Sequence, residues 1–429
     1  MLFVFLLLLL MPAAHAQLLI PFSYWGCSKS KMSVADSTSA NFSAGTFSNT
    51  MVSGNSVILS PAQVSGTFTS RVLDVYCGGI YSWSNFAWRS TLPFEKELTS
   101  TSEMPADYSA ASGTLMNSVS VYYNFNETAI NTAPSGNDFA DRSGNARHAT
   151  ETSLGSYGVS GKFINAARLN GTSSYINVPA TVASTAKSYT IATWLKTTTT
   201  AQGYSFDAQD GSNRIIIAPF CGSTCTVNAK IGVGFGATVG TIPSSTVASP
   251  NDGNWHHLVV TLDAASGNAT IFLDGTSVFV YNTWGTGFNI GSSIKIGARY
   301  DGSNWYFNGD LDEYAIWNRA FSAAEVLTLY RRGANRVRFQ VRSCTSSTCA
   351  DVPAWRGPDG TTATFFSELY NNTVQLARTG NAIATYPILY FSNFTSLALP
   401  TNRYFQYQAT LQTDNVTYTP DITYSRTYR

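Results

Sequence analysis

Hydrophobic and polar residues alternate over short stretches along most of the chain. Clear examples are SYTIATWLKT (188–197), HHLVVTLD (256–263), ATIFLDG (269–275) and SIKIGARY (293–300). A period of two residues is typical of β-strands with one buried face, and the Gly, Asn and Asp residues between the runs suit turns. The pattern predicts an all-β fold made of β-sandwiches.

Helical periodicity is nearly absent, and its main occurrence follows residue 321. Ser322 and Glu325 form the pattern of a capping box, which marks the start of a helix. Arg331, Arg332 and then Gly333 are expected to end it, with Gly333 in the left-handed position just beyond the last turn. One short helix is therefore predicted within the β structure.

Charge is sparse in this chain of 429 residues, since 12% of its residues are charged and its net charge is +1. A protein that binds nucleic acid neutralises phosphates with clustered Lys and Arg, so the composition gives no reason to expect such a partner. The length is sufficient for two domains.

The first sixteen residues have the character of a signal peptide. An apolar run from Leu2 to Met11 precedes the small residues around Ala14 and Ala16, although no Lys or Arg stands before the run. The run is too short to span a bilayer comfortably, so cleavage before Gln17 is predicted. The mature protein is expected to be secreted or at the cell surface, with no membrane span after cleavage.

Six cysteines are consistent with an oxidising compartment. Two pairs are close in sequence, and short loops close most readily, so we predict the disulfides Cys221–Cys225 and Cys344–Cys349 and, by remainder, Cys27–Cys77. A zinc site is the alternative, but these spacings without partnering His residues fit it poorly.

Residues 118–332 contain a series of segments in a recognisable order. They include VYYNFNET (121–128), DRSGNARHAT (141–150), GKFINAARLNGTSSYINVP (161–179), NWHHLVVTLDAASGNATIFLDG (254–275) and FNGDLDEYAIWNRAFSAAEV (307–326). The series resembles the LamG-like domain, a concanavalin A-like jelly roll shared by laminin G modules and pentraxins. The resemblance implies recognition of glycans or of protein surfaces, so a glycan or a cell-surface protein is the expected partner.

The flanking segments resemble the two halves of one other module. Tryptophan-rich residues 65–98 and the later strand NRVRFQVRSC (335–344) are similar to parts of a discoidin-type, galactose-binding-like sandwich of prokaryotic surface proteins. We therefore predict a discontinuous outer domain of residues 17–110 and 333–429, with the jelly roll inserted through a linker at 99–118. Exposed loops accept such insertions at low cost. Three consecutive domains are the alternative.

The acidic residues of GDLDEYAIW (309–317) invite a catalytic interpretation. Retaining glycosidases need two carboxyl groups about 5 Å apart, and family-16 hydrolases of this fold place theirs on one strand as E-x-D-x-E. This pattern is missing here. Strand alternation puts Asp310 and Asp312 on one face and Glu313 with Leu311 on the other, so we predict no catalytic residues.

Calcium is the other interpretation of the same residues. The resemblance implies that Asp312 lies near the opening strand and helps to hold a structural calcium ion, with Asn126, Asp138 and Asp141 as further oxygen ligands. The alternative is that these side chains accept hydrogen bonds from backbone amides and hold no ion.

Aromatic residues in loops provide the candidate ligand surface. The segments TWGTGF and RYDGSNWYFNG contain Trp284, Tyr300, Asp301, Asn304 and Trp305, and aromatic rings beside polar groups are typical of sugar sites. The expected function is that of an exported, non-catalytic carbohydrate-binding or adhesion protein. A structural component of a cell envelope or surface filament is the alternative, followed by a glycoside hydrolase.

Overall fold

The computed structural model describes most of the chain. These residues are 33–74, 82–83, 85–98, 115–154, 156–182, 185–222, 225–226, 229–236, 242–285, 287, 289–369, 392–393 and 399–428. The predicted signal peptide, Cys27, Cys77 and most of the predicted linker lie outside the described residues.

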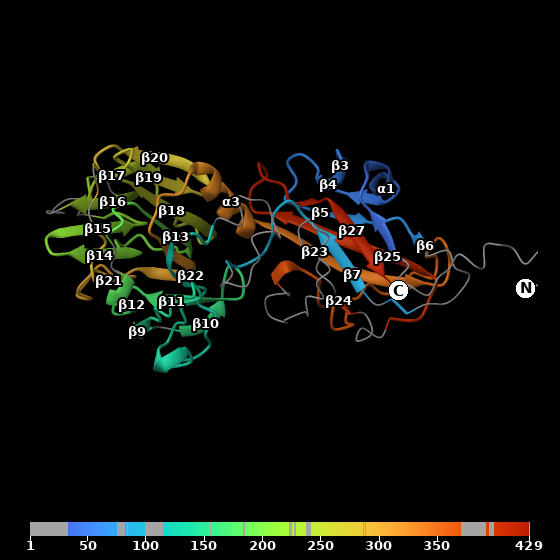
Figure 1. Cartoon of the computed structure of the whole chain (residues 1–429), viewed down its shortest axis with the longest axis horizontal. Coiled ribbons are helices and arrows are strands. Elements are labelled where there is room, and N and C mark those ends of the chain that lie inside the picture. Colours follow the sequence, from blue (N-terminus) through green and yellow to red (C-terminus); the bar gives the residue numbers. More distant parts are fainter. Residues whose placement is uncertain are drawn as a thin grey trace, which may run out of the picture.

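Two β-rich domains lie side by side, with a helix between them (Figure 1). Within the described residues the inner domain contains two sheets. The larger has β10 (Ser156–Ser160), β11 (Asn165–Asn170), β22 (Asn308–Trp317), β13 (Tyr189–Lys196), β18 (Trp255–Asp263), β19 (Asn268–Leu273) and β20 (Thr276–Tyr281) in this order, with β8 (Val119–Tyr123) also paired to β22. The other has β17 (Ser244–Ala248), β16 (Lys230–Gly236), β15 (Asn213–Ala218), β14 (Phe206–Asp210), β21 (Ser293–Ile296), β12 (Tyr175–Val178) and β9 (Thr150–Thr152).

The inner core lies between these two sheets. Leu195 and Val260 from the larger sheet belong to one apolar cluster with Ile217 and Ile294 from the smaller one. Antiparallel strands with alternating side chains place one set of residues inward, as the sequence pattern predicts. Strand β13 is buried on both faces, because α3 and its neighbours cover the other side.

The outer domain is built from strands of both chain segments. One sheet has β1 (Ser33–Asp36), β27 (Tyr424–Tyr428), β7 (Asn85–Arg89) and β24 (Ser392–Asn393) in this order. A second sheet has β2 (Thr46–Ser48), β5 (Ser65–Thr69), β25 (Tyr404–Thr413) and β23 (Asn335–Cys344), and β6 (Leu73–Asp74) also pairs with β25. A third sheet has β26 (Asp421–Ile422), β4 (Ser56–Leu59) and β3 (Thr50–Ser53). Phe68 and Trp88 share its core with Phe339 and Tyr407. Strands before residue 99 thus pair with strands after residue 334, across the whole inner domain.

Helical segments are few among the described residues. They are α1 (Ser39–Ser43), α3 (Ala323–Ala334) and the short 3-10 turns Pro134–Gly136 and Ala180–Val182. The predicted capping box of α3 is present, since Ser322 Oγ accepts from Glu325 N and Glu325 Oε2 accepts from Ser322 N. The predicted end of the helix is wrong: Gly333 lies inside it, and Asn335 is the capping residue.

Gly333 is required by packing rather than by a left-handed turn. A Cβ atom at this position would lie 2.5 Å from the Trp194 ring, so the helix approaches β13 more closely than any side chain would allow. Further contacts join the two domains here: Asp414 N donates to Ala334 O (2.9 Å), and Lys162 Nζ pairs with Asp414. The inner domain is therefore fixed to the outer one by packing and by the ion pair between Lys162 and Asp414.

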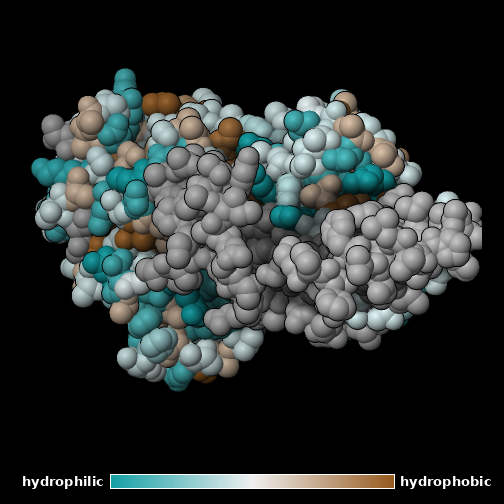
Figure 2. Space-filling model, turned by 45° about the vertical axis from the view of Figure 1, so that its right-hand side comes forward, coloured by the Kyte–Doolittle hydropathy of each residue, from teal (hydrophilic) through white to brown (hydrophobic). Residues whose placement is uncertain are grey.

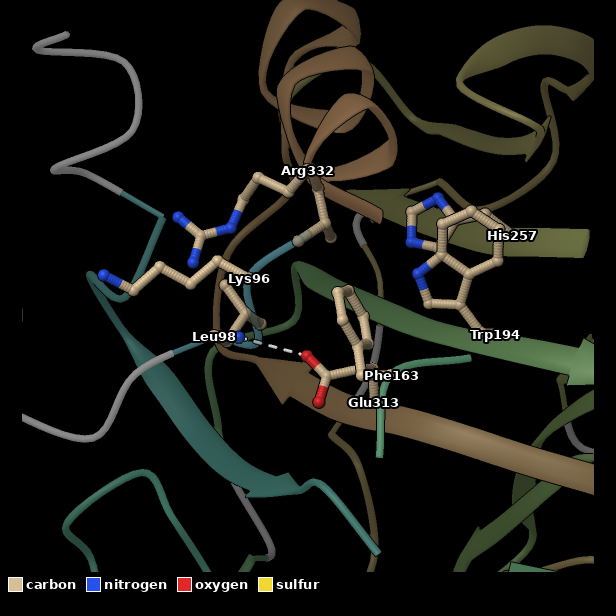
Figure 3. A pocket seen from close by; sticks show the side chains of 8 residues that line it. Lys96, Leu98, Phe163, Trp194, His257, Glu313 and Arg332 are labelled. Atoms are coloured by element: carbon tan, nitrogen blue, oxygen red, sulfur yellow. Dashed lines mark hydrogen bonds between the residues drawn. The ribbon is translucent and has the colours of Figure 1, made fainter. Parts of the chain in front are cut away.

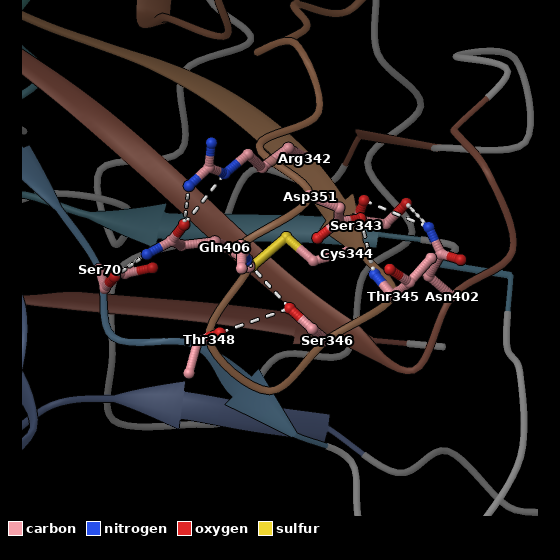
Figure 4. The surroundings of a disulfide bond; sticks show 12 residues. Ser70, Arg342, Ser343, Cys344, Thr345, Ser346, Thr348, Asp351, Asn402 and Gln406 are labelled. Carbon is pink, nitrogen blue, oxygen red and sulfur yellow. Dashed lines mark hydrogen bonds between the residues drawn. A yellow bond between two sulfur atoms is a disulfide. The ribbon is translucent and has the colours of Figure 1, made fainter.

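Two of the predicted disulfides, Cys221–Cys225 and Cys344–Cys349, are present in the structure. Figure 4 shows the second, at the end of β23, beside Arg342 and Gln406. Arg342 Nε donates to Gln406 Oε1 (3.0 Å), and Gln406 Nε2 donates to Ser70 O (2.7 Å). These bonds link β23 to β25, and β25 to the residue that follows β5. No helix in the described part of the chain is long and apolar enough to cross a membrane.

Candidate functional site

The loop of residues 299–306, which connects β21 to β22, is held in one shape by its own backbone. Gly302 N donates to Arg299 O (2.8 Å), and Arg299 N donates to Asn304 O (2.9 Å). The Asp301 carboxylate accepts from Ser303 N (3.1 Å), a local turn bond typical of Asp. A loop fixed in this way presents its side chains with little ordering cost when a ligand binds.

Four aromatic rings gather at this loop, and we call Tyr175, Tyr300, Trp305 and Tyr306 the aromatic face. Tyr175 and Tyr306 stack with ring centroids 6.4 Å apart and planes at 24°. Tyr306 Oη donates to Gly302 O (2.7 Å), and all four residues are half-buried. The face thus offers broad apolar rings beside exposed polar groups, the composition of a small-ligand surface.

Trp305 stands in the left-handed backbone region, with φ of 57°. Bulky residues adopt this conformation rarely, and such outliers occur mostly where the surroundings hold them for a purpose. Tyr204 supplies part of that support: Tyr204 N donates to Trp305 O (2.9 Å), and the two rings stack at 5.9 Å. The buried disulfide Cys221–Cys225 belongs to the same cluster.

A buried ion pair lies beneath the face. Asp207 on β14 is fully buried, pairs with Arg214 of β15, and accepts from Tyr300 N (3.1 Å). Burial raises the pKa of Asp207 to about 6, although the Arg214 guanidinium acts in the opposite direction. Arg214 also lies over the Tyr300 ring, 4.9 Å from its centroid, which fixes the loop to the sheet.

Four of the five predicted ligand residues come together here: Tyr300, Asp301, Asn304 and Trp305. Trp284 does not, and its prediction as a surface residue is wrong. It is 3% exposed, belongs to the inner core, and donates from Nε1 to Lys187 O (3.0 Å). A tryptophan whose single polar group finds a backbone acceptor is readily buried, even from a segment rich in Gly and Thr.

Sequence reasoning missed the contribution of the neighbouring strands to this face. Tyr175 and Asn177 of β12 point away from the core, because Ile176 and Val178 between and beside them belong to it. Lys295 of β21 pairs with Asn177 in the sheet ladder. The alternation of YINV and SIKI contained this information, but only the pairing of β12 with β21 places the residues together.

Hydrophobic side chains on the surface seen in Figure 2 are scattered among hydrophilic ones. The large exposed hydrophobic residues of the described part of the chain come from separate segments; they are Met51, Val64, Ile130, Val280, Val352 and Val416. Single exposed apolar residues are ordinary for a soluble protein. The stacked rings of the aromatic face therefore stand out by their arrangement rather than by surface hydrophobicity.

The side chains of the acidic strand β22 are distributed over the two faces of the sheet differently from the prediction. Glu313 has φ of 53°, and the pairing with β13 shifts between Ala192 and Trp194, so a β-bulge interrupts the alternation. Asp312 and Glu313 consequently lie on the same side of the sheet, while Leu311 faces the inner core. The predicted division of the two carboxylates between opposite faces is wrong for this reason.

Each acidic group of β22 already has protein partners. Asp310 forms a two-pronged pair with Arg168, at 2.7 and 2.8 Å. Asp312 accepts from the backbone N–H of Lys162 (2.8 Å), Phe163 (3.2 Å) and Glu313 (2.8 Å). These bonds correspond to the alternative in which the carboxylate caps backbone amides.

Glu313 is equally enclosed. Its Oε1 accepts from Tyr122 Oη (2.5 Å), and its Oε2 accepts from Leu98 N (3.0 Å). Burial raises the pKa of Glu313 and of Asp312, and the nearby carboxylate of Glu97 raises both further. These carboxyl groups face protein rather than solvent, which leaves no room for a sugar between them.

The other predicted calcium ligands are used in the same way. Asp141 accepts from Tyr122 N (3.1 Å) and Arg147 N (2.9 Å), and Asp138 from Asn131 N (2.8 Å). Asn126 donates from Nδ2 to Glu97 (2.5 Å). Among the described residues no three His, Cys, Asp or Glu side chains are grouped so as to hold a metal ion, so these residues do not fit a calcium site.

A small cavity of about 10 Å³ adjoins Glu313 at the domain junction, enough for roughly one water molecule. Figure 3 shows its lining, which comprises Lys96, Leu98, Phe163, Trp194, His257, Glu313, Leu329 and Arg332. His257 is fully buried against Trp194, and burial lowers its pKa to about 3. The cavity is too small for a sugar ring.

Comparison with known proteins agrees with the fold of the inner domain. Residues 170–327 match the model of the concanavalin A-like lectin/glucanases superfamily, so the predicted jelly roll is confirmed for this part of the chain. The match contains Tyr175 and the whole 299–306 loop. No curated protein matches the sequence.

Many solved structures are similar to parts of the chain, and they include these three. Domain 4 of the extracellular arabinanase AbnA from Geobacillus stearothermophilus, solved with arabinotriose, is 24% identical over 49% of this chain and 98% of its own, with a TM-score of 0.33. The binding domain of Paraclostridial mosquitocidal protein 1 is 14% identical over 62% of this chain and 72% of its own, with a TM-score of 0.38. A pentraxin from Limulus polyphemus is 16% identical over 36% of this chain and 72% of its own, with a TM-score of 0.27. At these TM-scores we draw nothing about function from them.

Proposed function

We propose that this chain is an exported, non-catalytic carbohydrate-binding protein that holds a glycan on the aromatic face of its inner domain. Recognition of glycans on a cell or matrix surface would make it an adhesion protein. The superfamily matched by residues 170–327 is described by its lectins and glucanases, which supports a saccharide as the ligand.

The observation that carries the proposal is the stacked pair of Tyr175 and Tyr306 at the loop that also contains Trp305. A pyranose ring has an apolar face of C–H groups and a rim of hydroxyls, so it suits an aromatic ring flanked by hydrogen-bonding groups. Asn304 and Asp301 are exposed at the edge of this surface and supply such groups. The bonds within the 299–306 loop supply the rigidity that keeps the cost of binding low.

The charges around the face support binding without hydrolysis. Hydrolysis of a glycosidic bond by the retaining mechanism needs two accessible carboxyl groups about 5 Å apart. Asp207 is buried against Arg214, and Asp301 is engaged by Ser303 and, at 3.6 Å, by Arg299. Asp207 is too deeply buried to reach a substrate, and Asp301 is already paired.

A glycan array with the wild-type protein and the Tyr306→Ala variant tests the proposal. We expect the wild type to bind at least one glycan class and Tyr306→Ala to lose up to about tenfold in affinity, since a stacked ring contributes about 0.5–1.5 kcal/mol beyond the area that it buries. Tyr404→Ala is the matched control, because Tyr404 is half-buried like Tyr306 but lies in the outer domain, where Arg403 covers its ring.

Three results would contradict the proposal. They are absence of glycan binding by the wild type, equal losses in the Tyr306 and Tyr404 variants, and release of reducing sugar from any bound polysaccharide. Ordered self-assembly without glycan binding would instead favour a structural role in a cell envelope or surface filament.

A further inference from the structure

Lys295 stands beside the Tyr175 ring and has no salt-bridge partner among the residues that the structure describes. It lies on β21, between Asn177 of β12 and Asp207 of β14 in the sheet ladder, and its side chain points away from the core residues Ile294 and Ile296. Its Nζ atom lies 5.7 Å from the centroid of the Tyr175 ring, within the range of a cation–π contact. The cation therefore adjoins the ring pair of the aromatic face.

The other cations around the face are matched by carboxylates. Arg214 pairs with the fully buried Asp207, and Arg299 lies 3.6 Å from Asp301. Burial lowers the pKa of Lys295, and the negative charge of Asp301 acts in the opposite direction without forming a salt bridge within the described residues. Partial burial withholds water from the ammonium group, so an anion brought to it would gain more than at a fully exposed lysine.

We infer that the aromatic face binds an acidic saccharide, with Lys295 pairing with a carboxylate or sulfate on a sugar ring held by Tyr175 and Tyr306. This inference rests on the proposed function and adds the chemical class of the ligand. A uronic acid carries its carboxylate on the ring that stacks, and a sulfate ester extends from the same rim. Asn177, the ladder neighbour of Lys295, provides an amide for the adjoining hydroxyl groups.

A sugar with an anionic group is favoured because the pairing is charge-assisted, which makes such bonds about twice as strong as neutral ones. The net charge of the chain is only +1, so a general attraction of polyanions does not explain selective binding. The preference should depend on one side chain and should weaken as salt concentration rises.

The test is a calorimetric comparison of oligogalacturonate with its fully methyl-esterified form, in which a methyl group replaces the charge of each carboxylate. We expect the wild type to bind the acid about tenfold more tightly, and Lys295→Gln to lose about tenfold for the acid but less than about twofold for the ester. A sulfated galactan and its desulfated form make up the second arm and show which anionic group is preferred. Lys230→Gln is the matched control, since Lys230 lies on β16 of the same sheet, three strands from β21.

Equal binding of the acid by wild type and Lys295→Gln, at equal melting temperature, would overturn the inference. So would equal affinity of the wild type for the charged and uncharged forms in both arms. If neutral glycans bind and Tyr306→Ala abolishes that binding, the proposed function stands while the acidic preference falls. Failure of every glycan, charged or neutral, would overturn both.

Discussion

The aromatic face and the domain junction are adjoining parts of the inner domain with opposite characters. The 299–306 loop leads directly into β22, and within a few residues the chain passes from half-exposed rings to the enclosed carboxylates of Asp312 and Glu313. Both regions contain acidic and aromatic residues. At the aromatic face the polar groups remain accessible beside the rings. At the domain junction the carboxylates already accept hydrogen bonds from backbone amides.

The difference shows why residue type alone does not identify a binding site. A carboxylate that accepts two or three N–H bonds from its own fold stabilises that fold and has little capacity left for a ligand. Asp312 is of this kind, whereas Asn304 and Asp301 lie at the surface of a loop that is already hydrogen-bonded through its backbone. Substitutions should therefore alter folding at the junction and binding at the face.

Asp312→Ala should have the largest effect on stability. It removes the acceptor of three backbone N–H groups, and each buried donor left unsatisfied costs about 1–3 kcal/mol. Relief of the repulsion with Glu97 offsets part of this, so we expect the free energy of unfolding to fall by about 3–5 kcal/mol in urea titrations. Asp301→Ala at the aromatic face is the control and should cost less than about 1 kcal/mol.

Equal losses from Asp312→Ala and Asp301→Ala would remove the distinction between the two regions. If Asp312→Asn retains most of the stability that Asp312→Ala loses, the effect lies in the acceptor oxygens, since the amide keeps one of them.

Glu313→Gln should have a smaller effect, visible as a change in pH dependence. Burial and neighbouring carboxylates raise the pKa of Glu313 in the folded protein above its ordinary value. Between the unfolded and the folded pKa the native state binds the extra proton, so the stability from this group is full at low pH and is lost as pH rises. The wild-type melting temperature should therefore fall as pH rises above about 5, and the variant should show a flatter profile.

His257 acts in the opposite direction, which provides an internal check. Burial lowers its pKa to about 3, so its contribution is present above the ordinary pKa of histidine and is lost as pH falls toward 3. The acid limb of the profile should remain in Glu313→Gln, while the decline above about pH 5 should weaken. Parallel profiles of the two proteins at every pH would contradict the role assigned to Glu313.

Much of the fold follows from local patterns in the sequence. Period-two runs such as YTIATWLK and WHHLVVTLD became β13 and β18, and Ser322 with Glu325 became the cap of α3. The bulge at Glu313 could not be predicted from local patterns, because it depends on the pairing of β22 with β13. It also depends on Tyr122 and Leu98, which lie near enough to donate hydrogen bonds to the displaced carboxylate.

Only the part of the candidate site that lies in one continuous segment could be predicted from the sequence. One loop sequence contains Tyr300, Asp301, Asn304 and Trp305, and alternation alone shows that they adjoin a strand. Tyr175 and Lys295 join them through strand pairing between segments over a hundred residues apart, which a single sequence does not reveal. Trp284 failed as a prediction because its burial depends on a distant backbone acceptor, Lys187 O.

Calcium removal should have the smallest effect, and it sharpens the contrast between the two regions most directly. An ion bound only by the native state raises the melting temperature by mass action. Asp312, Asp138 and Asp141 each accept backbone N–H bonds, so we expect less than about 1 °C of difference between buffers with calcium and with EDTA at equal ionic strength. Magnesium serves as the control for non-specific charge effects. A rise of several degrees that only calcium produces, and that Asp312→Asn abolishes, would show that the junction carboxylates bind an ion after all.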